Sequence, residues 1–144
     1  MVIAVDFDGT IVEHKYPAIG REIPFATETL RMLIAERHKL ILWSVREGEL
    51  LEEAVNWCRE RGVEFYAVNR DYPEETLKNN NHFSRKLKAD LFIDDRNIGG
   101  LPDWGTIYHM IHDNTTWEDE LHNASRRDID SQEPPKRKKK WGIF

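Results

Sequence analysis

The stretch Val2-Ile3-Ala4-Val5-Asp6-Phe7-Asp8-Gly9-Thr10 decides the fold of this chain. Its first residues are all apolar, which is typical of a parallel strand buried on both faces. Side chains alternate along an extended chain, so Asp6 and Asp8 point to one side and Phe7 to the other. Gly9 lets the backbone turn and approach a ligand closely. Because open α/β sheets bind ligands at the carboxyl ends of their strands, this stretch predicts a site at that edge.

Length and composition are those of one soluble domain. The chain has 144 residues, with 40% hydrophobic and 33% charged residues, which is enough for a full core under a charged surface. No apolar stretch approaches the roughly 18–20 residues that cross a bilayer, and Asp6 and Asp8 interrupt the apolar N-terminus, unlike in a secretory signal. The single Cys58 favours a reducing compartment. We therefore expect a cytoplasmic protein with no membrane partner.

Strand and helix patterns alternate along the chain. Apolar runs predict buried strands at residues 2–5, 40–43, 63–68, 91–93 and 106–111. Helical spacing of apolar residues predicts helices at 24–37, 47–61 and 117–127. This alternation predicts a three-layer, Rossmann-like α/β domain with a mostly parallel central sheet.

The composition changes after about residue 127. Residues 128–135 are polar and contain prolines, and 136–140 form a basic run, so we expect a domain of residues 1–127 and a mobile tail of 128–144. A basic run can follow nucleic-acid phosphates, but it is more often solvated, and the net charge of −5 argues against nucleic acid as the partner. The apolar end, 141–144, could contact either another protein or the domain itself.

Three predicted strands end in polar residues that suit phosphate chemistry. These residues are Asp6 and Asp8 after the first strand, Ser44 after the second, and Asp94 and Asp95 after the fourth. The carboxyl ends of parallel strands lie along one edge of a sheet, so we expect the three groups to meet there.

The segment Asp6-Phe7-Asp8-Gly9-Thr10 resembles the DxDGT signature of the haloacid dehalogenase superfamily of phosphohydrolases. The resemblance covers residues 1 to about 112, because a hydroxyl residue, a lysine and a closing acidic pair follow in the superfamily's order. Ser44, Lys86 and Phe92-Ile93-Asp94-Asp95 match these parts, and Lys88 is an alternative to Lys86. The resemblance implies that the first strand lies between the second and the fourth in the sheet.

The resemblance also implies a phosphate monoester hydrolase with two chemical steps. Asp6 would attack phosphorus to form an aspartyl-phosphate, and Asp8, held protonated, would protonate the leaving alcohol and then activate water. Lys86 would orient the nucleophile and the phosphate, and Ser44 would donate a hydrogen bond to a phosphate oxygen. The implied phosphate-binding set is completed by Phe7, Gly9, Thr10 and Val45.

A cation is needed in such a site, because carboxylates alone would repel a phosphate dianion. Mg²⁺ suits it, since this ion prefers oxygen ligands and binds carboxylates together with phosphate oxygens. By resemblance, its ligands would be the carboxylates of Asp6 and Asp94 and the backbone carbonyl of Asp8, with Asp95 bound directly or through water.

No insertion is long enough to form a cap domain over this site. The connection at residues 11–23 has 13 residues and the one at 69–85 has 17, so the resemblance implies a capless member with an open pocket. Arg46 could contact the substrate there or form a surface ion pair. His14 and His82 could border the pocket or be solvated loop residues.

Several functions are compatible with this pattern. The substrate could be a small metabolite, covered by a neighbouring subunit or the 69–82 loop, or the phosphorylated end of a macromolecule. A nucleotidase, a polynucleotide-end phosphatase or a phosphotransferase is the alternative within enzymes. From other classes, the alternatives are a catalytically silent binding protein and a phospho-acceptor signalling domain. The close pairing of Asp6 and Asp8 argues against the signalling domain.

Overall fold

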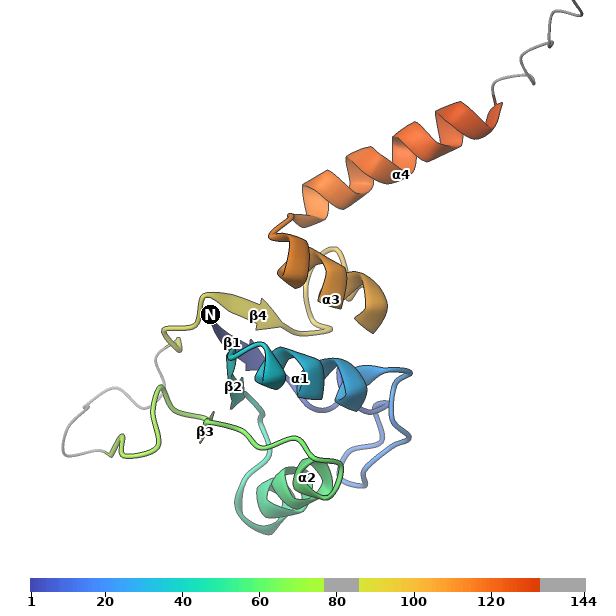
Figure 1. Cartoon of the computed structure of the whole chain (residues 1–144). Coiled ribbons are helices and arrows are strands. Elements are labelled where there is room, and N and C mark those ends of the chain that lie inside the picture. Colours follow the sequence, from blue (N-terminus) through green and yellow to red (C-terminus); the bar gives the residue numbers. More distant parts are fainter. Residues whose placement is uncertain (77–85, 133–144) are drawn as a thin grey trace, which may run out of the picture. The chain divides into compact units, whose positions relative to one another are not determined.

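The computed structural model describes residues 1–76 and 86–132, which contain a four-stranded, all-parallel sheet and four helices (Figure 1). The strands are β1 (Val2–Val5), β2 (Lys39–Leu42), β3 (Ala67–Val68) and β4 (Leu91–Ile93). The helices are α1 (Ala26–Ala35), α2 (Gly48–Glu60), α3 (Trp104–Asp113) and α4 (Trp117–Gln132). The predicted Rossmann-like α/β class is confirmed.

The order of the strands is β3-β2-β1-β4, as predicted for β1. Val5 at the end of β1 pairs with Leu42 on one side and with Ile93 on the other. The backbone N–H of Asp6 donates to the carbonyl of Ile93 at 2.9 Å, so the ladder continues one residue beyond β1. The polar residues that follow β1, β2 and β4 therefore arrive together at one edge of the sheet.

Both faces of the central strands are buried. The apolar side chains of β1 and β2 have at most 1% of their surface exposed at Ile3, Ala4, Val5, Leu40, Ile41 and Leu42. Helix α1 buries Leu30 and Leu33, and helix α2 buries Ala54 and Cys58. Burial raises the pKa of the Cys58 thiol to about 12, so this residue behaves as a small hydrophobic side chain.

The predicted strand at residues 106–111 is wrong, because this segment lies within helix α3. The buried residues Trp104, Ile107 and Ile111 follow helical spacing, which a short apolar run can conceal. Asp103 begins the helix by accepting a hydrogen bond from the N–H of Thr106 at 3.0 Å, and this bond lowers the pKa of Asp103. The strand predicted at residues 63–68 is also shorter, since only Ala67–Val68 is extended.

The chain divides into two compact units. Residues 1–108 form the first, which contains the sheet and every site residue discussed below, and the second begins at His109. Helix α4 confirms the helix expected at 117–127 and continues to Gln132, so the tail boundary at residue 127 stays a prediction. No helix in the described part of the chain is long and apolar enough to cross a membrane.

Trp104 ties helix α3 to the loop after β1. Its side chain is 1% exposed, and its Nε1–H donates to the carbonyl of Thr10 at 3.0 Å. We expect Trp104→Phe to lower the free energy of unfolding by about 2–3 kcal/mol, because the buried carbonyl loses its donor and a small cavity opens. Urea denaturation measures this change. Trp117→Phe, at a residue that is 41% exposed, is the control and should cost less than about 0.5 kcal/mol; equal losses would contradict the assignment.

Candidate functional site

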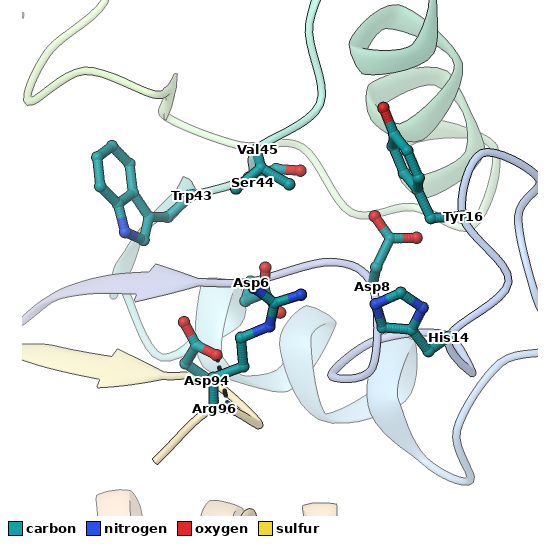
Figure 2. Close-up of a pocket in the computed structure, with 9 residues that line it drawn as sticks. All are labelled: Asp6, Asp8, His14, Tyr16, Trp43, Ser44, Val45, Asp94 and Arg96. Carbon is teal, nitrogen blue, oxygen red and sulfur yellow. Dashed lines mark hydrogen bonds between the residues drawn. The ribbon is translucent and has the colours of Figure 1, made fainter. Parts of the chain in front are cut away.

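Three carboxylates meet at the carboxyl edge of the sheet. Asp6 follows β1, and Asp94 and Asp95 follow the neighbouring β4, so that one oxygen from each lies within 4.8 Å of the others. Figure 2 shows Asp6 and Asp94 directed into the same pocket. The sequence prediction that these acidic groups converge is therefore confirmed.

The charges of this cluster repel one another. The pKa of Asp6 is raised from 3.8 to about 7, first because the carboxyl is buried and then because the charge of Asp94 lies close to it. A hydrogen bond from Thr10 opposes the shift without cancelling it. Three crowded carboxylate oxygens are the donor set that hard divalent cations prefer, so these residues fit Mg²⁺ or Ca²⁺.

Thr10 and Gly9 contact the acidic residues but do not line the pocket. The Thr10 hydroxyl donates to Asp6 Oδ2 at 3.0 Å and accepts the backbone N–H of Asp95 at 3.1 Å. Gly9 has a φ of +84°, and a Cβ at this position would lie 2.3 Å from Asp95 Oδ2. Neither residue is among those that line the pocket. Their predicted role in phosphate binding stays a prediction, and the structure assigns them to shaping the acidic cluster.

The acidic cluster opens into a pocket of about 520 Å³ (Figure 2). Its lining includes six residues predicted as site residues, namely Asp6, Asp8, His14, Ser44, Val45 and Asp94. It also includes three that were not predicted, namely Tyr16, Trp43 and Arg96. Phe7 is fully buried and packs edge-on against Trp57 with ring centroids 5.8 Å apart, so its side chain belongs to the core and does not line the pocket.

Ser44 is held in the pocket by Asn69, which sequence reasoning missed. The Ser44 N–H donates to Asn69 Oδ1 at 2.8 Å, and Asn69 Nδ2 donates to the Ser44 carbonyl at 3.0 Å. The Ser44 hydroxyl oxygen accepts the backbone N–H of Arg46 at 3.1 Å, which leaves its own O–H as a donor. Asn69 directly follows β3, and a polar residue after a third parallel strand was the signal available in the sequence.

Arg46 forms a buried ion pair with Asp8. Its Nε donates to Asp8 Oδ2 at 2.7 Å and its Nη2 to Oδ1 at 2.8 Å, and these bonds raise the pKa of Arg46. The alternative of a surface ion pair is therefore wrong, because Arg46 has no exposed side-chain surface. The Asp8 carboxylate lies outside the cluster of three, and its backbone carbonyl as a metal ligand stays a prediction.

The role of Lys86 as a catalytic lysine, with Lys88 as its alternative, stays a prediction. Lys86 is exposed, its ammonium lies 4.9 Å from the centroid of the Phe92 ring, and it is not among the pocket-lining residues. The backbone N–H of Lys88 donates to Asp71 at 2.7 Å. His82 lies outside the described residues.

Arg96 brings a positive charge to the pocket. Its backbone N–H donates to Asp94 Oδ1 at 2.9 Å (Figure 2), and its exposed side chain lines the pocket. The signal in the sequence was its place directly after Asp94 and Asp95. Trp43, predicted as a packing residue, packs on the core with one part and lines the pocket with another.

The raised pKa of Asp6 makes the stability of the metal-free protein depend on pH. Between about pH 4 and pH 7 the folded state binds more protons than the unfolded state, so stability falls as the pH rises through this window. We expect Asp6→Asn, which carries no charge, to stabilise the protein by about 1–3 kcal/mol at pH 8, after discounting for solvent screening. Thermal denaturation in EDTA measures the effect. The same pair of proteins at pH 4 is the control, where the difference in stability should be smaller. An Asp6→Asn variant that is less stable than wild type at pH 8 would contradict the unfavourable charge on Asp6.

No protein-family model and no curated protein matches the chain. A solved structure of a conserved protein from Bacteroides thetaiotaomicron is similar, with 70% sequence identity and a TM-score of 0.77. The match covers 83% of this chain and 95% of that one. The description of that protein states no activity.

Proposed function

We propose that this chain, which belongs to the same family as the conserved protein from Bacteroides thetaiotaomicron, is a Mg²⁺-dependent phosphohydrolase of the haloacid dehalogenase superfamily. One observation carries the proposal: Asp6, Asp94 and Asp95 converge from two neighbouring strands, and two of them, Asp6 and Asp94, line a pocket together with Ser44. A cation held by these carboxylates would offset their repulsion and attract a phosphate group.

Asp6 is the proposed nucleophile. It lies at the end of β1 and points into the pocket, where its carboxylate can attack the phosphorus of a bound monoester. The attack forms an aspartyl-phosphate and releases the alcohol, and water then hydrolyses the intermediate to regenerate the carboxylate. When bound by Asp6, Asp94 and Asp95, Mg²⁺ would neutralise charge on the transferring phosphoryl group.

Asp8 is the proposed acid and base. Both of its oxygens accept hydrogen bonds from Arg46, which pairs with the carboxylate anion, so Asp8 must take up a proton before it acts as the acid. Each oxygen keeps a further lone pair for this proton. The carboxyl lines the pocket, where it can give a proton to the leaving alcohol and take one from water. Ser44 would donate to a phosphate oxygen, and Arg96 would attract the anionic substrate to the pocket.

Release of inorganic phosphate tests the proposal. Wild-type protein with Mg²⁺ is offered sugar phosphates, nucleotides, phosphopeptides and oligonucleotides with phosphorylated ends, and we expect turnover that stops in EDTA. Asp6→Asn should lose at least about 10³-fold in kcat, because the amide cannot act as the nucleophile. Equal turnover by both proteins would exclude Asp6, and absence of turnover on every substrate would favour the silent binding protein.

Asn69 gives a second test of the pocket. We expect Asn69→Ala to lower kcat/KM by about tenfold, because it removes the two hydrogen bonds that hold the Ser44 peptide, a loss of about 1.4 kcal/mol. Steady-state kinetics with the best substrate of the panel measures the change. Asn56→Ala, at an exposed position on α2, is the matched control and should leave kcat/KM unchanged. A kcat/KM for Asn69→Ala equal to that of wild type would show that Ser44 needs no such support.

A further inference from the structure

Arg46 is a buried guanidinium with an acceptor for each of its five N–H groups. The Nε–H and one of the two N–H groups of Nη2 donate to Asp8, as described above. Nη2 also donates to the Ala18 carbonyl at 3.0 Å, and Nη1 donates to the carbonyls of Pro17 at 3.1 Å and Leu50 at 3.4 Å. A buried charge is tolerated only when its donors are satisfied, and here five acceptors match five donors.

The same guanidinium packs against two aromatic rings. Its central carbon lies 5.2 Å from the ring centroid of Phe7, in the core, and 5.2 Å from that of Tyr16, which lines the pocket and is 48% exposed. Asp8 and Tyr16 both face the pocket, and Figure 2 shows them on the same side of it. Arg46 therefore connects a pocket carboxylate to a segment of the pocket wall.

We propose that Arg46 is a positioning residue that fixes the Asp8 carboxylate and the wall segment Tyr16–Ala18 as one unit. This inference rests on the proposed function, because it assigns Asp8 its place in the reaction. Arg46 itself makes no contact with the phosphate, since all its donors are used within the chain and none of its side chain is exposed. Among the described arginines that line the pocket, the exposed Arg96 is available to the substrate.

The bidentate contact explains why an arginine is needed. Two parallel hydrogen bonds fix both the position and the plane of the carboxylate, whereas the ammonium of a lysine is a point charge that fixes neither. The bonds to Pro17 and Ala18 hold the wall at a set distance from Asp8. A purely stabilising role is the competing explanation, and it predicts loss of folded protein without a specific loss in kcat.

Kinetics of two variants separate these roles. We expect Arg46→Ala to lower kcat by about 10²-fold, since a displacement of about 1 Å costs that much, and to leave KM within about threefold. Arg46→Lys should keep the fold and the charge and still lose about tenfold or more in kcat. Arg21→Ala is the matched control, because Arg21 lies in the same 11–23 connection as the wall segment but forms an exposed ion pair with Glu13 at 3.5 Å. This variant should leave kcat and KM unchanged.

Chemical rescue is the decisive readout. Ethylguanidinium contains the atoms that Arg46→Ala removes, so we expect it at millimolar concentrations to restore kcat of this variant at least tenfold. It should not rescue Asp8→Asn, and ethylammonium, which lacks the fork of donors, should not rescue Arg46→Ala. A raised KM with unchanged kcat, a folded Arg46→Ala without rescue, or an Arg46→Lys equal to wild type would overturn the proposal. If Arg46→Ala does not fold, Arg46→Lys decides.

Hydrogen exchange tests the wall without using turnover. We expect amides of the 11–23 segment to exchange at least tenfold faster in Arg46→Lys than in wild type, and those of helix α1 to remain unchanged. An unchanged exchange rate at 11–23 would overturn the link to the wall. If the wild-type protein hydrolyses no phosphate ester, the proposed function fails, whereas the exchange rates still decide whether Arg46 holds this segment.

Discussion

Parallel pairing of β1 on both sides is the constraint on which the structure depends. Val5 pairs with Leu42 and with Ile93, so the residues after three strands come to one edge of the sheet. The buried apolar side chains of these strands stabilise that register, because a slip of one residue would reverse every side chain. The position of the acidic cluster therefore follows from the pairing and packing of these strands.

The carboxylates of the pocket are balanced in two different ways. The protein itself supplies the cation for Asp8, through the guanidinium of Arg46. The Asp6 carboxylate accepts a hydrogen bond from the Thr10 hydroxyl, the Asp94 carboxylate accepts one from the backbone N–H of Arg96, and Asp6 keeps a raised pKa. This difference separates a carboxylate built into the fold from a group of three suited to an added cation.

Much of this arrangement could be predicted from the sequence, because strand ends and short acidic motifs are local features. The burial of β1 follows from its apolar run, and the meeting of Asp6 with Asp94 follows from the parallel arrangement of the strands. The central place of β1 was implied by the resemblance to the DxDGT signature. Arg46 could not be placed, since its partners at Asp8 and Pro17 are distant in the chain. The segment 106–111 was predicted as a strand because a short apolar run is compatible with the periodicity of a strand and of a helix. In the structure the segment is helical, and Asp103 caps the helix N-terminus.

Gly9 limits how the family can diverge. With a positive φ and the Asp95 carboxylate where a Cβ would stand, this position has room only for hydrogen. At this point the backbone of Gly9, in the loop after β1, lies directly against the side chain of Asp95, in the loop after β4. Homologues that lose this glycine should therefore also have lost or rebuilt the acidic cluster, and the two changes are expected to occur together in evolution.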